Sequence, residues 1–228
     1  MGKGSKPFST TICSSPSVAL SLPKASEACF DVQEQLRFIE QRLERLKGIR
    51  KTEAINLQAR DFVYTELVPA WEKIQNNILH FVRMEGEEFS RCLSPSDFGF
   101  HNALLTPEGR LTFHDFEYAG WDDPSKAVCE FFCQPEVSVP LSFFENFVEQ
   151  VFVFLGDSTG IQRTRLLLPA YRIKWCCIML NEFLKGASLR RRFAQVQEDN
   201  PLKKSEQLAK AKYYLESIFV KYLIMNSE

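Results

Sequence analysis

The residues with the clearest capacity for chemistry are Asp97, Asn102 and Asp115. Asp97 and Asn102 stand in a D-x-x-x-x-N spacing, and Asp115 follows within residues 113–117, which read FHDFE. Mg²⁺ accepts carboxylate and amide oxygens and keeps waters and phosphates as its other ligands. We therefore expect Asn102 and Asp115 to bind Mg²⁺, with Asp97 close by as a base or an orienting group.

The sequence between Asn102 and Asp115 predicts a β-hairpin that would bring these two residues together. Ala103–Leu105 and residues 110–113 have the composition of two short strands, and residues 106–109, which read TPEG, supply the turn. Proline and glycine set backbone angles in such turns that most residues avoid. Because the hairpin is short, both ligands should lie near its open end.

This combination of motifs resembles the aminoglycoside phosphotransferase/choline kinase family, relatives of the protein kinases that phosphorylate small molecules. The resemblance implies that Asp97 accepts the proton of the substrate hydroxyl and that Asn102 and Asp115 hold Mg²⁺ against the phosphates of ATP or GTP. It also implies a weaker metal position at Glu117, because the small-molecule kinases often carry an acidic residue there.

The chain departs from the family pattern in the loop before Asp97. The family usually has His-Gly immediately before this aspartate, where the histidine is thought to brace the loop, and here Pro95 and Ser96 take those places. The departure changes a bracing group and leaves the groups that would contact phosphate in place.

The resemblance covers residues 28–184 and implies the helical lobe of a kinase. Such an enzyme also needs an N-terminal β-rich nucleotide lobe of roughly 100 residues, and we expect this lobe to be missing or truncated here. The predicted organisation is an irregular N-terminal segment, residues 1–28, and a kinase-like C-terminal lobe, residues 29–228. Within this lobe, residues 93–124 hold the catalytic loop and metal hairpin, and residues 125–228 form a helical substrate region.

Hydrophobic periodicity predicts that most of the remaining chain is helical. The predicted fold class is therefore mainly α with a small β-hairpin (α+β). Pro69 should start a new helix, because proline is tolerated in a first turn. The helix over residues 141–155 is rich in Phe and Val and should be well buried. The predicted helices cover residues 32–46, 54–67, 69–82, 125–133, 141–155, 163–185 and 203–223.

Composition narrows the classes of function. The 228 residues are 45% hydrophobic and include 20 Phe, which is enough for a substantial core. A net charge of −1 gives no electrostatic basis for binding nucleic acid or an anionic membrane. No apolar run reaches the roughly 20 residues that span a bilayer, and no signal-peptide pattern is present. Seven cysteines without framework spacing favour reduced thiols and a cytoplasmic location.

Other polar residues near the motif have structural interpretations. We expect His101 and His114 to point away from the metal ligands, because they alternate with them along short strands. Asp122 and Asp123 should cap the helix that follows. The thiols at positions 129 and 133 should pack in the core, because no second pair follows at zinc spacing.

The function implied by the resemblance is phosphoryl transfer to a hydroxyl of an amino sugar, a sugar or an amino alcohol. Three acidic residues could attract a cationic acceptor, namely Glu145, Glu149 and Glu182. The alternative is an inactive kinase lobe that serves as a binding or structural module. A second copy or a partner chain would then cover the face where the nucleotide lobe would dock. A metal-dependent phosphoesterase using Asp97, Asp115 and Glu117 is a weaker hypothesis, because a His-rich ligand set is missing.

Overall fold

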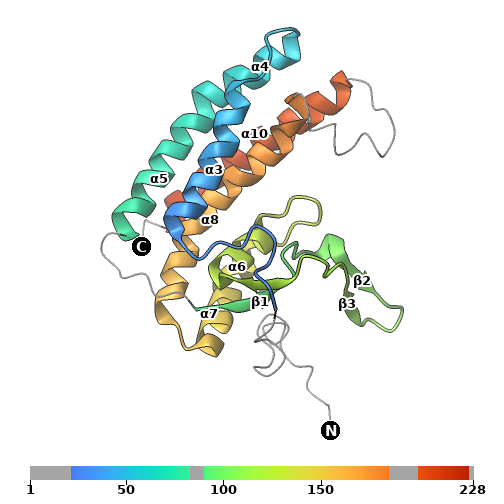
Figure 1. The fold of residues 1–228 in the computed structure, drawn as a ribbon. Coiled ribbons are helices and arrows are strands. Elements are labelled where there is room, and N and C mark those ends of the chain that lie inside the picture. The colour runs from blue at the N-terminus through green and yellow to red at the C-terminus, as the bar shows by residue number, and fades with distance from the viewer. Residues whose placement is uncertain (1–21, 83–89, 185–199, 226–228) are drawn as a thin grey trace. The chain divides into compact units, whose positions relative to one another are not determined.

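The computed structural model of the protein describes residues 22–82, 90–184 and 200–225 (Figure 1). Most of the predicted irregular segment, residues 1–21, lies outside these ranges. In the part of the chain that the structure describes, no helix is both long enough and apolar enough to cross a membrane.

The chain divides into two compact units. Unit 1 is formed by residues 1–34 and 85–168, and unit 2 by residues 35–84 and 169–228. The elements in chain order are α3 (Val32–Lys47), α4 (Ala54–Phe62), η1 (Val63–Leu67), α5 (Val68–Val82), β1 (Cys92–Ser94), η2 (Phe100–Asn102), β2 (Ala103–Leu105), β3 (Leu111–Phe113), β4 (Gly120–Asp122), α6 (Pro124–Cys133), η3 (Leu141–Phe143), α7 (Phe144–Leu155), α8 (Ser158–Met179), η4 (Leu180–Phe183) and α10 (Pro201–Met225).

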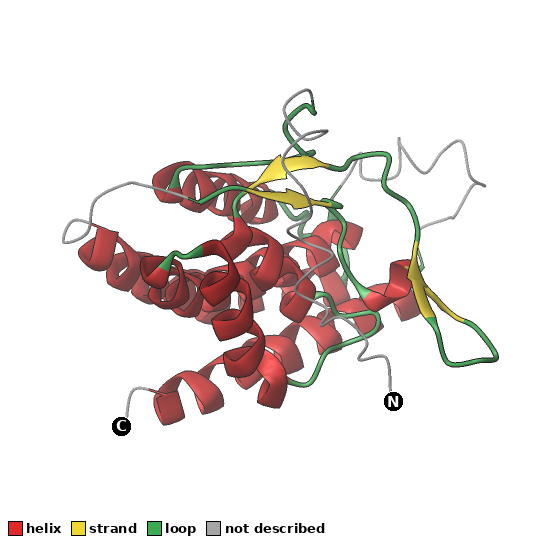
Figure 2. Ribbon diagram, turned by 90° about the horizontal axis from the view of Figure 1, so that it is seen from below, coloured by secondary structure: helices red, strands yellow, loops and turns green. Residues whose placement is uncertain are grey.

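Unit 1 holds the strands, which form two separate antiparallel pairs (Figure 2). β1 pairs with β4 and places Leu93 opposite Trp121, whereas β2 pairs with β3. The segment before α3 also runs beside β4, where Lys24 forms a parallel bridge with Trp121. Gly120 permits this close approach, because a Cβ there would lie 2.3 Å from the carbonyl oxygen of Pro23.

Helix α6 is the centre of unit 1, and all ten of its residues are buried. Its thiols face α8: Cys129 Sγ lies 3.5 Å from the carbonyl oxygen of Thr164, and Cys133 Sγ lies 3.7 Å from that of Leu168. Burial removes solvent from the charged form of the Cys129 thiol and raises its pKa well above the ordinary value. The predicted packing role of both cysteines is confirmed.

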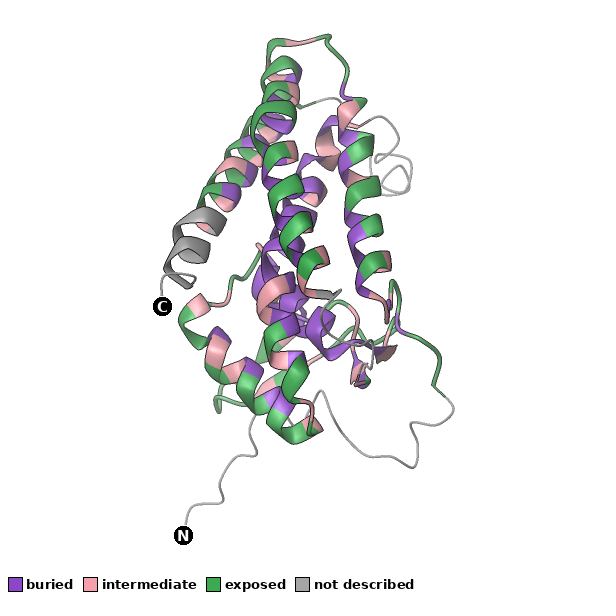
Figure 3. Cartoon of the chain, turned by 90° about the vertical axis from the view of Figure 1, so that its left-hand side faces the viewer, coloured by how far each residue is buried: buried purple, intermediate pink, exposed green. Residues whose placement is uncertain are grey.

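The described residues of unit 2 form helices and the short connections between them. Helices such as α3 bury one side and expose the other, and Figure 3 shows this alternation of buried and exposed residues along the ribbon. On α3, Leu36, Ile39, Leu43 and Leu46 form the buried stripe. This is the stripe that the periodicity of the sequence predicts.

The prediction that Pro69 starts a separate helix is wrong. α4, η1 and α5 follow one another without a break, and the five residues of η1 are π-helical. Pro69 has no N–H to donate to the carbonyl of Thr65, and a wider turn is one way for a helix to pass such a position. The Thr65 hydroxyl also donates to the carbonyl oxygen of Asp61 at 2.9 Å.

The predicted fold class is confirmed, since the described chain is mainly helical with small antiparallel pairings. One burial prediction is wrong in detail. α7 buries a single side, whereas Val153 is 76% exposed and Phe154 is 54% exposed. α8 begins at Ser158, earlier than predicted, because the Asp157 carboxylate accepts the Gly160 N–H at 2.9 Å.

Candidate functional site

The predicted hairpin is present and turns at the predicted residues. The Gly109 N–H donates to the Thr106 carbonyl, and the Thr106 N–H donates to the Arg110 carbonyl, both at 2.9 Å. Gly109 has φ of 79°, a left-handed conformation that glycine adopts without steric penalty. Pro107 precedes it inside the turn. This is a three-residue hairpin loop in which a tight turn is followed by a glycine bulge.

The hairpin brings the backbones of Asn102 and Asp115 close together at its open end. The His114 N–H donates to the Asn102 carbonyl at 3.0 Å, which continues the β2–β3 ladder by one residue. Asp115 is therefore adjacent to the residue that pairs with Asn102. The Asn102 side chain is buried, and its Nδ2 donates to the Asp97 carbonyl oxygen at 3.0 Å. This bond ties together the two ends of the D-x-x-x-x-N motif.

Unusual backbone conformations flank the predicted chemistry. Among the described residues, the non-glycine residues with positive φ are Glu27 at 55°, Ser96 at 71° and Asp115 at 65°. Ser96 immediately precedes Asp97, and Asp115 is itself a predicted ligand. Left-handed conformations are unfavourable for residues with a Cβ, and they gather at functional sites where the surrounding structure holds them. Their positions here agree with a functional assignment for this loop.

The predicted catalytic residue, Asp97, presents its carboxylate to solvent, with 58% of the side chain exposed. His101 Nε2 lies 3.2 Å from Asp97 Oδ1. The expectation that His101 points away is therefore wrong. The residues around it form the short 3-10 helix η2 and not a strand, so alternation does not apply there. His114 and Asp115 are exposed, as is Glu117.

Aromatic rings pack together beside the loop that carries Asp97. Phe98 follows Asp97 and stacks on Phe131 of α6, with ring centroids 4.6 Å apart. Phe98 also lies 5.1 Å from the ring of Phe113 on β3. Phe100 meets the edge of Phe131 at 5.3 Å. One cluster thus fixes both the Asp97 loop and the strand that leads to Asp115, and such ring contacts add stability beyond their buried area.

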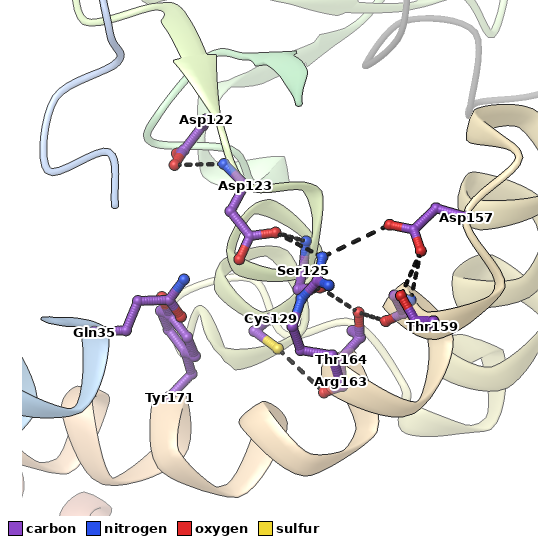
Figure 4. A network of polar contacts seen from close by, with 11 residues as sticks. Gln35, Asp122, Asp123, Ser125, Cys129, Asp157, Thr159, Arg163, Thr164 and Tyr171 are labelled. Atoms are coloured by element: carbon purple, nitrogen blue, oxygen red, sulfur yellow. Dashed lines mark hydrogen bonds and ion pairs between the residues drawn. The ribbon is translucent and has the colours of Figure 1, made fainter. Parts of the chain in front are cut away.

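A buried polar network holds β4 and α6 next to the loop (Figure 4). Asp123 is the N-cap of α6 and accepts the Ser125 N–H at 2.9 Å, so the predicted capping role is confirmed for this residue. Arg163 of α8 contacts Asp123 Oδ1 at 3.4 Å and donates through Nε to the Ser125 hydroxyl at 3.1 Å. Arg163 was not predicted from the sequence, because a contact between residues 40 positions apart leaves no local pattern.

The neighbouring carboxyl, Asp122, is fully buried and pairs with Lys126 Nζ at 2.5 Å. It also accepts the Asp123 N–H at 2.9 Å. Burial raises the pKa of Asp122, although the Lys126 charge opposes the shift. Asp122 therefore anchors the turn from β4 into α6.

The residues of the motif fit the chemistry of Mg²⁺. Asn102 offers an amide oxygen and Asp115 an exposed carboxylate, and Mg²⁺ is usually bound by one or two carboxylates together with phosphates and waters. Among the described residues, no group of three or more His, Cys, Asp or Glu side chains could form a closed metal cage. Magnesium binding by Asn102 and Asp115 stays a prediction. The weaker position at Glu117 remains a prediction.

Two of the acidic residues expected to attract a cationic acceptor have basic partners. Glu145 Oε2 lies 2.6 Å from Arg165, and Glu182 Oε2 lies 3.4 Å from Lys203. Glu149 is exposed. The partners reduce the net negative charge that Glu145 and Glu182 would offer to a substrate.

No family model matches the sequence, and no curated protein matches it. The solved structures that resemble the fold include two small-molecule kinases. An ethanolamine kinase from Plasmodium vivax has a TM-score of 0.45 and 14% identity, over 88% of this chain and 53% of that chain. An aminoglycoside phosphotransferase from Alicyclobacillus acidocaldarius has a TM-score of 0.37 and 15% identity, over 84% of this chain and 58% of that chain.

Both matched proteins belong to the class that the motif resembles, and the likeness concerns the fold. With TM-scores below 0.5, it carries no argument about residues, substrate or activity. The chain spans little more than half the length of either matched protein.

Proposed function

We propose that the protein transfers the γ-phosphoryl group of ATP or GTP to a hydroxyl of a small polar molecule. The main observation that supports the proposal is a pair of hydrogen bonds that link the parts of the motif. Asn102 Nδ2 donates to the Asp97 carbonyl oxygen, and the Asn102 carbonyl accepts the His114 N–H. The proposed general base and the two proposed metal ligands therefore lie on backbone segments that are hydrogen-bonded to each other.

The reaction forms a bond between the acceptor oxygen and the γ-phosphorus and breaks the bond between that phosphorus and the β–γ bridging oxygen. Asp97 orients the acceptor hydroxyl and takes its proton. Asp97 Oδ1 faces His101, which leaves Oδ2 for the hydroxyl. Asn102 and Asp115, with Glu117 as a weaker third ligand, would hold Mg²⁺. When bound, this ion neutralises charge on the phosphates.

The acceptor class proposed is an amino sugar, a sugar or an amino alcohol. Glu149 is the most available of the acidic residues considered for a cationic acceptor, since Glu145 and Glu182 face basic side chains. We also propose a reducing, cytoplasmic setting. The six cysteines among the described residues are buried thiols that form no disulfide with one another, as in proteins kept away from oxidising compartments.

The test is nucleotide-dependent phosphate transfer by the full chain across a panel of amino sugars, sugars and amino alcohols. We expect turnover with at least one acceptor class and its loss in Asp97→Ala, with the circular dichroism spectrum unchanged. Glu108→Ala serves as the matched control, because Glu108 is an exposed carboxylate in the turn of the same hairpin. Equal turnover in Asp97→Ala and the wild type would refute the role of Asp97.

A second candidate function is a kinase-like lobe that binds another chain without catalysis. The hairpin strand β2 favours it, since Leu104 is 62% exposed and Leu105 is 71% exposed. These successive leucines point to opposite faces of the hairpin, and exposed apolar side chains of this kind suit a covering partner or a second copy. Calorimetry with Mg-ATP separates the candidates. Micromolar binding by this chain alone supports the enzyme, whereas dimerisation without nucleotide binding supports the binding module.

A further inference from the structure

We propose that His101 is a positioning residue that holds the Asp97 carboxylate in place for phosphoryl transfer. The inference rests on the proposed function. His101 stands four residues after Asp97, on the C-terminal side of the loop, in the 3-10 helix η2 that ends at Asn102. One short helix therefore carries both the group that holds the base and a predicted metal ligand.

The contact joins a buried group to an exposed one. His101 Nε2 lies 3.2 Å from Asp97 Oδ1, with 15% of the His101 side chain exposed against 58% for Asp97. A mostly buried imidazole has few alternative rotamers, so it can restrict a carboxylate that is otherwise free to rotate in solvent. The contact leaves the second carboxylate oxygen available to an acceptor.

Gly99 makes room for this placement of the imidazole. A Cβ at position 99 would lie 2.5 Å from His101 Nδ1 and 2.7 Å from Cε1, closer than real Cβ contacts allow. Gly99, which lies between Phe98 and Phe100, thus leaves space for the His101 ring. The two flanking phenylalanine rings pack on Phe131.

The second nitrogen of the ring indicates which atom carries the proton. Within the described part of the chain, His101 Nδ1 is buried and has no hydrogen-bond partner. A buried N–H without an acceptor is costly, so the neutral ring is expected to carry its proton on Nε2, toward Asp97. This arrangement lets His101 donate to the carboxylate.

The hydrogen bonds on the N-terminal side of the loop do not hold the Asp97 carboxylate. On the N-terminal side, Ser96 is in a left-handed conformation, its Oγ donates to the Ser26 carbonyl at 3.0 Å, and its N–H donates to Ser94 Oγ at 3.1 Å. These bonds fix the backbone of the loop but do not contact the carboxylate of Asp97. Among the described residues, the side-chain nitrogen that lies close to that carboxylate is His101 Nε2, 3.2 Å from Oδ1.

The kinetic test compares His101→Phe, His101→Gln and the wild type in the phosphate-transfer assay. A misplaced base can lower the rate about 100-fold, so we expect His101→Phe to reduce kcat about 10- to 100-fold with little change in KM. Gln can place its amide near the position of Nε2, so His101→Gln should recover part of kcat. In an Asp97→Asn background, His101→Phe should cause no further loss.

The control is His80→Phe, since His80 is an exposed histidine on α5, outside the loop and the hairpin. It should leave kcat unchanged, with all variants checked by thermal melting. Equal kcat in His101→Phe and the wild type would overturn the positioning role while leaving the proposed function intact. Additive losses in the Asp97→Asn background would also overturn it.

An NMR measurement tests the contact without turnover. The chain has three histidines, so long-range ¹H–¹⁵N spectra of the rings can be assigned by substitution. At alkaline pH we expect the His101 ring to be protonated on Nε2 in the wild type and to lose this preference in Asp97→Ala. A ring protonated on Nδ1 would overturn the inference. A wild type with the expected tautomer but no turnover would overturn the proposed function and, with it, the catalytic purpose of the contact.

Discussion

The substitution Lys126→Met tests how much the buried ion pair between Lys126 and Asp122 contributes to the stability of the fold. Lys126 Nζ lies 2.5 Å from Asp122 Oδ2, and the two side chains are 5% and 0% exposed. Removing one partner of a buried pair costs about 3–5 kcal/mol, because the remaining charge has no compensation. Asp122 keeps the Asp123 N–H, so we place the loss near the lower bound, at about 3 kcal/mol.

This loss is large enough for a simple assay. With a urea m-value of about 2–3 kcal/mol/M, it shifts the unfolding midpoint by about 1–1.5 M. We expect the double variant Asp122→Asn/Lys126→Met to recover at least half of the loss, because it removes both charges together. Lys210→Met is the matched control, since Lys210 is an exposed lysine on α10.

The sign of the pH dependence follows from Asp122. Burial raises its folded-state pKa above the ordinary 3.8, so the ionised carboxyl destabilises the fold increasingly as pH rises above that value, until the folded pKa is passed. Removing Lys126 takes away an opposing charge and strengthens this effect. The stability lost in Lys126→Met should therefore be smaller at pH 5 than at pH 7. A loss below about 1 kcal/mol at pH 7, or a larger loss at pH 5, would refute the reasoning.

Three further predictions follow from the hairpin and the helix caps. Asp115→Ala should weaken Mg-ATP binding about tenfold or more in calorimetry, whereas Glu108→Ala should leave it unchanged; equal affinities would exclude Asp115 as a ligand. Gly109→Ala should lower the unfolding free energy by about 1 kcal/mol or more, because φ at this position is 79°; an unchanged melting temperature would contradict this. Burial opposes the shift at Asp157, but the Thr159 hydroxyl and the Gly160 N–H hold its pKa below 3.8. The stability that Asp157 contributes is thus present above pH 3.8 and lost as pH falls through its folded pKa. In Asp157→Asn, the unfolding free energy should fall less steeply as pH decreases below 3.8. An unchanged pH dependence would contradict the stabilising role of the Asp157 carboxylate.

Local chemistry explains what the sequence could predict. The hairpin turn was predictable because Pro107 and Gly109 favour the backbone angles that the turn needs. The start of α6 was predictable because an aspartate directly before a proline is a common helix N-terminus. The stripe on α3 follows from helical spacing alone.

The features that the sequence did not predict depend on tertiary structure. The contact between His101 and Asp97 requires η2, whose 3-10 turn replaces the expected strand alternation. Arg163 contacts Asp123, which lies far from it in the sequence, so no local sequence pattern predicts the contact. Val153 is exposed although it is apolar, because an apolar residue type does not require burial.

The most direct test of the proposed magnesium site is paramagnetic NMR with Mn²⁺-ATP, in which Mn²⁺ substitutes for Mg²⁺. We expect substoichiometric Mn²⁺-ATP to broaden the NMR signals of the Asn102 side-chain amide and the Asp115 backbone amide together. Both effects should disappear in Asp115→Ala, while Glu108→Ala should retain them. Broadening confined to other residues, or unchanged broadening in Asp115→Ala, would contradict the claim that the hairpin assembles a metal site.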